Sequence, residues 1–285
     1  GSETTEMFII KRAVEWCNAN SRTYGISAIS ISIGTSELYS DYCDQYSPSL
    51  ADAIANATAK NISVVVATGN EANTQAIALP SCMTNSIPVW ATNKDDTTWQ
   101  YSNYNWMVKL FAPGVNINTT KIGGYTNGGA GTSYSTPMVS GSIAILNQYY
   151  KEIGKPFTLR PKIDIEPVLF ASGDQIVGLS KDSWSRVNVN KALMVLDKEA
   201  PLVTLNSPPD GSVFYTFSKK DRANVDFSCD AVDWQLASLD LVIKDTVGTE
   251  VYRESRILSG EESTQQEFNV QLNNGLYKWN CETVD

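Results

Sequence analysis

With 285 residues, the chain can hold one large domain or two of ordinary size. Its composition, 42% hydrophobic and 19% charged, is that of a folded protein and excludes a disordered one. The net charge of −9 argues against nucleic acid or an anionic membrane as a partner. No apolar run approaches the ~18–20 residues that a membrane span needs. The chain contains no histidine, so a serine nucleophile within it would lack its usual base.

Helical and strand patterns alternate along the first part of the chain. The predicted elements are helices at 6–20 and 50–60 and strands at 26–34, 62–67 and 87–91. The strand at 62–67 is a dense β-branched run, as expected for a strand buried on both faces. Such alternation predicts an α/β fold in which helices cover a mostly parallel sheet. Ligands of such sheets bind beyond the carboxyl ends of the strands.

The stretch GTSYSTPMVSG at 131–141 organises the rest of the chain. Small residues come first, then a proline early enough for the first turn of a helix, then an apolar run. This pattern places Ser133 at or just before a helix N-terminus, where unpaired N–H groups favour negative charge on a nearby oxygen. The hydroxyl suits a nucleophile, but it equally suits a helix N-cap. The stretch alone leaves both interpretations open.

Four motifs, taken together, resemble those of the subtilisin-like serine proteases, the subtilases. In chain order they are ISISIG at 29–34, VVVATGN at 64–70, FAPG at 111–114 and GTSYSTP at 131–137. The resemblance covers residues 1–196. It implies a partial subtilisin-like fold and the hydrolysis of peptide bonds through an acyl-enzyme.

The resemblance also implies a role for each motif. Ser133 would be the nucleophile, and Asn70 would donate its side-chain N–H to the oxyanion, with the Ser133 backbone N–H as the second donor. Without Ser133 downstream, Gly69 and Asn70 would be ordinary turn residues. The substrate would contact two strand ends and the residue before the nucleophile, namely Ser32, Ile33, Gly34, Ala67, Thr68, Gly69 and Thr132. Calcium is often bound by the family, but no compact acidic loop marks a site here.

Two departures from the family pattern matter for activity. The catalytic Asp and His of the family, which precede the substrate-binding strand, have no counterpart, and Met138 stands where the nucleophile motif usually has a second His. We therefore expect the sequence to begin partway into a subtilase domain and to be inactive by itself. The alternative is a pseudoprotease that binds extended peptides by strand addition without cleaving them. A serine-carboxyl protease would carry an Asp at the position of Asn70, which counts against that class.

The cysteines indicate an extracellular or cell-surface protein. Cys43 and Cys82 lie in loops beside the proposed site and could pair, while Cys229 and Cys281 lie 52 positions apart in a second domain. Cys17, on the apolar face of the first helix, predicts a buried thiol. No C-x-x-C motif or Cys/His cluster predicts zinc.

A second, all-β domain is predicted at 203–285, after a polar, proline-marked linker at 197–202. Strand patterns occur at 202–205, 224–229, 238–243 and 276–281, and NNG at 273–275 predicts a hairpin turn. Tyr277, Trp279 and Cys281 share one face opposite Cys229, which resembles an immunoglobulin-like sandwich. We expect this domain to be incomplete at its C-terminus. It provides another functional alternative, a cell-surface adhesion or carbohydrate-binding protein that acts through the sandwich.

Overall fold

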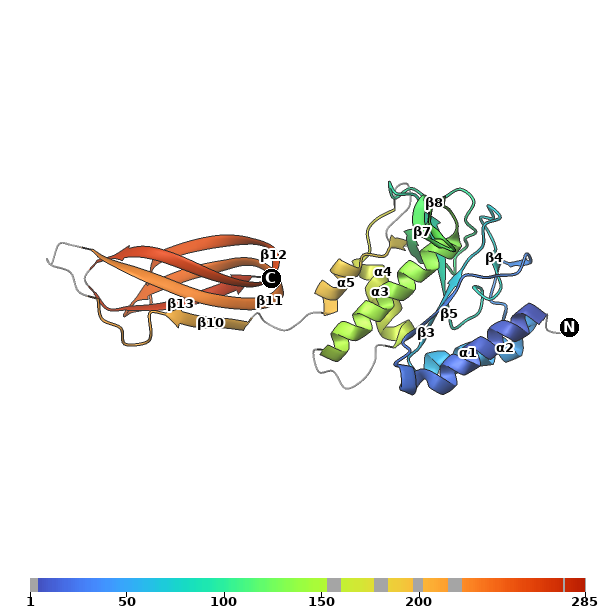
Figure 1. The fold of residues 1–285 in the computed structure, drawn as a ribbon, viewed down its shortest axis with the longest axis horizontal. Coiled ribbons are helices and arrows are strands. Elements are labelled where there is room, and N and C mark those ends of the chain that lie inside the picture. The colour runs from blue at the N-terminus through green and yellow to red at the C-terminus, as the bar shows by residue number, and fades with distance from the viewer. Residues whose placement is uncertain are drawn as a thin grey trace. The chain divides into compact units, whose positions relative to one another are not determined.

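Two units with separate hydrophobic cores make up the chain, divided between residues 197 and 198. The structure, a computed structural model, describes residues 5–152, 160–176, 184–196, 202–214, 222–273 and 275–284. The division falls inside the linker expected at 197–202. Figure 1 shows an α/β first unit and an all-β second unit.

A parallel five-stranded sheet forms the centre of the first unit, in the order β1-β3-β5-β6-β9. Its strands are β1 Ala28–Ile31, β3 Ser63–Ala67, β5 Ser86–Thr92, β6 Leu110–Pro113 and β9 Ser185–Arg186. Every residue of β3 is buried, as its dense apolar run predicts for a strand covered on both faces. The expected parallel sheet flanked by helices is confirmed.

Helices cover both faces of this sheet (Figure 1). They are α1 Thr5–Tyr24, α2 Pro48–Ala59, α3 Thr132–Glu152, the π-helical turn η2 Pro161–Ile165, α4 Glu166–Ser172 and α5 Val189–Leu196. The core cluster that joins α1 and α2 includes Val64 and Val66 of β3. Val65 points to the opposite face, because side chains alternate along a strand, and α3 packs across the sheet.

Helix α1 buries the apolar stripe that its sequence predicts, including Met7, Ile10 and Val14. Cys17 follows on the same stripe but is only half-buried and has a free thiol, so the prediction of a buried thiol is wrong. Partial burial raises the pKa of the Cys17 thiol. None of the described helices has the length and hydropathy that a membrane span requires.

Shorter elements complete the first unit. They are β2 Leu38–Tyr39, which pairs with β4 Ile77–Ala78, the 3-10 turn η1 Asp44–Tyr46, and the hairpin of β7 Ile117–Lys121 with β8 Gly124–Gly129. A disulfide joins Cys43, which follows β2, to Cys82, which follows β4, and this is the pairing that the sequence suggested. The β7–β8 hairpin leads directly into α3 and was not predicted.

The second unit consists of one long antiparallel hairpin and two shorter strands that pair with it. The strands are β10 Leu202–Ser207, β11 Ala223–Asp245, β12 Glu250–Leu272 and β13 Tyr277–Val284. Strand β10 pairs with the first half of β11, and β13 pairs with its second half. The prediction of separate strands at 224–229 and 238–243 is wrong, since both belong to β11.

Strand β11 folds back on itself. Cys281 pairs with Leu241 in the ladder, yet it is disulfide-bonded to Cys229 with a Cα–Cα distance of 6.6 Å. A straight strand would separate Cys229 from Leu241 by about 40 Å. The bend lies where the register of β11 against β12 shifts, between Val232 and Ser238. The hairpin therefore forms two layers with Cys229–Cys281 between them, the cysteine pair that the sequence suggested.

The connection between β12 and β13 differs from the predicted hairpin turn at 273–275. In the described strands, the end of β12 pairs with the start of β11, whereas the start of β13 pairs with the end of β11. The chain thus crosses between layers at this point, and the hairpin prediction is wrong; Asn274 itself lies outside the described residues. A relation to immunoglobulin-like domains stays a prediction.

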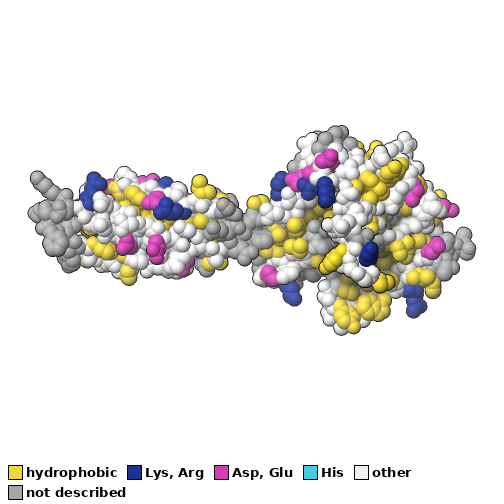
Figure 2. Space-filling view, turned by 45° about the horizontal axis from the view of Figure 1, so that its top comes forward, with side chains coloured by type: hydrophobic (Ala, Val, Ile, Leu, Met, Phe, Trp, Pro, Cys, Tyr) yellow, Lys and Arg dark blue, Asp and Glu magenta, His cyan; other side chains and the backbone are white. Residues whose placement is uncertain are grey.

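Acidic and basic side chains are interspersed on the surface of the second unit that Figure 2 shows. Arg253 of β12 is an example, because it forms ion pairs with Asp240, Glu250 and Glu282. Exposed pairs of this kind add little stability but keep a sheet surface polar.

Candidate active site

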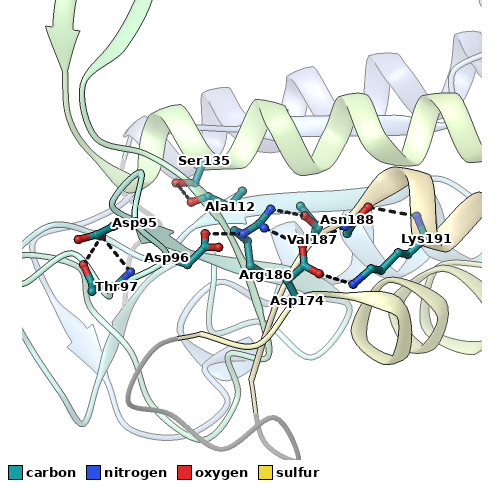
Figure 3. A network of polar contacts seen from close by, with 10 residues as sticks. All are labelled: Asp95, Asp96, Thr97, Ala112, Ser135, Asp174, Arg186, Val187, Asn188 and Lys191. Atoms are coloured by element: carbon teal, nitrogen blue, oxygen red, sulfur yellow. Dashed lines mark hydrogen bonds and ion pairs between the residues drawn. The ribbon is translucent and has the colours of Figure 1, made fainter. Parts of the chain in front are cut away.

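The start of α3 is seated against the end of β6. Ser135 Oγ donates to the Ala112 carbonyl over 2.9 Å (Figure 3). The Gly131 N–H donates to the Gly114 carbonyl over 2.9 Å. A Cβ at Gly114 would lie 2.7 Å from the Ala91 Cβ and 2.8 Å from the Gly131 carbonyl oxygen. Only glycine fits this position, which explains the glycine of the FAPG motif.

Asn70, just beyond β3, is held by the first residue of α3. The Thr132 backbone N–H donates to Asn70 Oδ1 over 2.9 Å, and the Thr132 hydroxyl donates to the same oxygen over 3.0 Å. The Gly69 N–H in turn donates to Thr132 Oγ1 over 3.2 Å. These bonds fix the oxygen end of the Asn70 amide. Its Nδ2 group donates to no atom of the described residues and is therefore available to a ligand.

The Asn70 amide and the Ser133 hydroxyl border the same small space. A Cβ built on Gly131 would lie 3.0 Å from Ser133 Oγ and 3.6 Å from both Nδ2 and Oδ1 of Asn70. Gly131 also has a φ of +152°, a backbone conformation that side chains disfavour. The glycine therefore keeps open the space between the two groups.

The backbone of Ser133 is arranged by the helix start. Thr132 N–H is bonded to Asn70 and Tyr134 N–H to the Gly131 carbonyl, whereas Ser133 N–H, in the first helical turn, has no partner among the described residues. The helix begins at Thr132, so Pro137 is its sixth residue and not in the first turn as predicted. Ser32 Oγ donates to the Ser133 carbonyl over 3.0 Å and thereby connects β1 to the helix start.

The residues expected to contact substrate lie in two different environments. Ser32, Ile33 and Gly34 are exposed just beyond the last paired residue of β1. Thr68, by contrast, has no exposed surface, and its hydroxyl donates to the Val89 carbonyl over 3.2 Å. Ala67 is also buried, so Gly69, which is partly exposed, is the residue of this strand end that can border a ligand. Thr132 is fully buried as well and contacts Asn70 and Gly69 instead of open space.

A buried asparagine and a group of ionised side chains were not predicted from the sequence. Asn103 is fully buried and forms hydrogen bonds with the loop that carries Asn70. The only signal was its place among aromatic residues in a loop, where a buried amide needs partners.

The ionised group surrounds Asp174, beside β9 (Figure 3). Asp174 accepts hydrogen bonds from Arg186 over 2.6 Å, Lys191 over 2.6 Å and Asn188 over 2.9 Å. Arg186 Nε also lies 2.5 Å from the Asp96 carboxylate. The hydrogen bond from Lys191 is the main reason why the pKa of Asp174 lies below its ordinary value. Among the described residues, no three cysteine, aspartate or glutamate side chains are grouped so that they could hold a metal ion.

Comparisons with known proteins agree with this geometry. The sequence model of the subtilase family matches residues 1–163, more than half of the chain. The chain belongs to the subtilase family. The family resemblance predicted from the four motifs is thus confirmed, and so is the subtilisin-like fold.

Several proteases resemble this subtilase in sequence. Alkaline serine protease ver112 of Corniculantispora psalliotae is 39% identical over 101 residues, which are 35% of this chain and 26% of that protein. Subtilisin BL of Lederbergia lenta is 30% identical over 139 residues, 49% of this chain and 47% of that protein. The chain thus spans about a quarter to a half of the length of these relatives.

Solved structures share the fold of the first unit. The protease domain of PatA, in its S218A mutant, is 25% identical with a TM-score of 0.55, and the similarity covers 65% of each chain. The prenylagaramide maturation protease PagA is 23% identical with a TM-score of 0.57 and covers 69% of this chain and 70% of that one, which shows the fold alone.

Proposed function

We propose that this subtilase chain supplies the nucleophile and the oxyanion-binding groups of a serine endopeptidase active site. The observation that carries the proposal is the shared space at Gly131, where a Cβ would lie 3.0 Å from Ser133 Oγ and 3.6 Å from the Asn70 amide, whose Oδ1 is held by Thr132 and whose Nδ2 has no partner among the described residues. A carbonyl carbon beside Ser133 would have its oxygen within reach of the Asn70 amide. Family membership supports the same chemistry.

In the proposed reaction, Ser133 Oγ attacks the scissile carbonyl carbon, and the electrons of the C=O bond move to the oxygen. Asn70 Nδ2–H and the Ser133 backbone N–H then donate to that oxyanion. Both groups lack a partner among the described residues, so they need not break a hydrogen bond first. Collapse of the intermediate expels the amine and leaves an acyl group on Ser133, which water removes.

The proton of Ser133 needs a base that these 285 residues do not provide as histidine. The base therefore comes from outside this chain, and the chain by itself is inactive in peptide hydrolysis. The substrate is a peptide in extended conformation, laid against Ser32, Ile33 and Gly34, and the partly exposed Gly69 borders the primary pocket at the strand end that also contains the buried Ala67 and Thr68.

The protein acts outside the cell or at its surface. Two disulfides, Cys43–Cys82 and Cys229–Cys281, support this assignment, because such bonds persist in oxidising compartments. The second unit is an immunoglobulin-like sandwich that associates the protease with a surface, and acidic and basic side chains are interspersed on the face of it that Figure 2 shows.

The test uses the full-length gene product with a quenched fluorogenic peptide and a fluorophosphonate label. We expect hydrolysis that Ser133→Ala abolishes, and a label that mass spectrometry maps to Ser133. Ser142→Ala is the matched control, since Ser142 is an exposed serine of the same helix whose hydroxyl donates to the Met138 carbonyl. Hydrolysis that survives Ser133→Ala would refute the proposal. Binding of the peptide without hydrolysis would support the pseudoprotease alternative. If the protein neither binds nor hydrolyses the peptide, the second unit is the functional part.

A further inference from the structure

Asn103 lies in the loop between β5 and β6 and has no exposed surface. Its Oδ1 accepts hydrogen bonds from the Glu71 and Asn73 backbone N–H groups, each over 3.0 Å. Its Nδ2 donates to the Thr68 carbonyl over 3.2 Å and to the Glu71 carboxylate. The Asn103 backbone N–H adds a bond to the Gly69 carbonyl over 3.0 Å. One buried side chain thus satisfies the polar groups of a whole loop.

The residues that are hydrogen-bonded to Asn103 precede and follow Asn70 in the sequence. The Asn70 backbone N–H donates over 2.9 Å to Glu71 Oε2, the oxygen that also accepts from Asn103. Gly69, with a φ of +105°, has no room for a side chain, because a Cβ there would lie 2.6 Å from Glu71 Oε2. The loop therefore closes tightly around the Asn103 amide.

We propose that Asn103 is the positioning residue for Asn70. Asn103 fixes the backbone on both sides of Asn70, while Thr132 fixes the oxygen end of the Asn70 amide from α3. Held from two directions, Asn70 Nδ2 faces the space beside Ser133 before a substrate arrives. A donor fixed in this way stabilises an oxyanion without reorganisation at the moment of reaction. The inference rests on the proposed function of Asn70.

A merely structural role for Asn103 predicts a different result. A buried amide that only supports the fold would change stability and lower activity independently of Asn70. A positioning residue acts through Asn70, so its effect disappears once the Asn70 amide is gone. A double-mutant cycle between the two residues separates these cases.

The experiment measures kcat and KM of the full-length gene product for wild type, Asn103→Ala, Asn70→Ala and the double variant. We expect Asn103→Ala to lower kcat by about tenfold or more, with KM changed by less than about threefold. In the Asn70→Ala background, the same substitution should change kcat by less than about twofold. Asn18→Ala is the matched control, a buried asparagine of α1 whose amide donates to the Ala53 carbonyl. A full effect of Asn103→Ala in the Asn70→Ala background would overturn the proposal.

A second pair of variants keeps the test valid if Asn103→Ala does not fold. Asn103→Asp has the same shape and keeps the two acceptor contacts, but it replaces the donor by a carboxylate facing Glu71. We expect it to lower kcat, and in the Asn70→Ala background we expect the same substitution to change kcat by less than about twofold. A full effect of Asn103→Asp in the Asn70→Ala background would contradict the proposal.

One measurement does not depend on hydrolysis. In the ¹⁵N-labelled 285-residue chain, the Asn70 side-chain amide signal is identified by its loss in Asn70→Ala. We expect Asn103→Asp to shift or broaden this signal and Asn18→Ala to leave it unchanged. An unmoved signal would refute the inference about Asn103. A shifted signal in this chain, together with a full-length gene product that hydrolyses no peptide, would refute the proposed function and leave the positioning role intact.

Discussion

The Ser32 hydroxyl donates a 3.0 Å hydrogen bond to the backbone carbonyl of Ser133, across 101 positions of sequence. In an unbroken α-helix that carbonyl would accept from the N–H of residue 137, but Pro137 has none. The proline therefore leaves a free acceptor at the start of α3, and Ser32 uses it. The end of β1 and the proposed nucleophile are fixed to each other by this bond.

Ser32→Ala should lower kcat/KM of the full-length gene product about fivefold. The substitution removes one hydrogen bond, worth about 1 kcal/mol, that fixes the position of Ser133. Fluorogenic peptide hydrolysis measures the effect. Ser30→Ala provides the control, since Ser30 is an exposed serine of the same strand. Equal losses in both variants would mean that the bond does not position the nucleophile.

Gly131→Ala should reduce kcat by about 10²-fold or more, the range seen when an oxyanion donor is lost. The new methyl group would lie 3.0 Å from Ser133 Oγ and 3.6 Å from Asn70 Nδ2, and the φ of +152° would add strain. Gly141→Ala, in the interior of α3 with open space around it, is the control. That substitution should stabilise the helix by up to about 1 kcal/mol and leave kcat unchanged. Retained activity in Gly131→Ala would show that the space at Gly131 is not where the substrate carbonyl binds.

Asp174→Asn should lower the free energy of unfolding of the first unit by about 2 kcal/mol at pH 7, through weaker bonds to Arg186 and Lys191. Because the pKa of Asp174 is lowered in the folded state, its contribution is present above the ordinary carboxylate pKa and is lost as the pH falls through the lowered value. The difference in melting temperature between wild type and Asp174→Asn should therefore narrow below about pH 4.

Scanning calorimetry at several pH values measures this difference. Glu15→Gln is the control, because Glu15 forms an exposed i,i+4 pair with Lys11 and should contribute less than about 0.5 kcal/mol. A constant difference between wild type and Asp174→Asn from neutral to acidic pH would contradict the lowered pKa.

Replacing Cys229 and Cys281 by alanine should lower the free energy of unfolding of the second unit by about 2–5 kcal/mol. The disulfide joins the two layers that the bent β11 forms, and its loss frees a loop with a sequence separation of 52. Replacing Cys43 and Cys82 is the reciprocal control and should affect the first unit only, because each unit has its own core. Hydrogen exchange measured separately over the two units distinguishes the outcomes. Protection lost equally from both units by either pair would show that they do not unfold independently.

The sequence by itself determined the central strands and several helices of the first unit, and the family to which its motifs belong. Strand β3 could be predicted because a dense run of β-branched residues is typical of a buried strand. Helix α1 could be predicted because its apolar residues recur at helical spacing. The absence of histidine is visible in the sequence alone, and the proposal of a base from outside this chain rests on it. These signals are local, so they can be recognised in the sequence without knowledge of the fold.

Only the tertiary structure shows which residues from distant segments of the chain are in contact. Asn103 has no periodic signal, and its role depends on a loop more than 30 positions away. The bend of β11 depends on burying both halves of one strand in a common core, which no pattern within the strand expresses. The contacts of Thr132 with Asn70 likewise exist only once α3 reaches the end of β3. Periodicity reports which face of an element is buried, whereas a hydrogen bond between distant segments is specified only when packing brings its donor and acceptor within 3 Å or so.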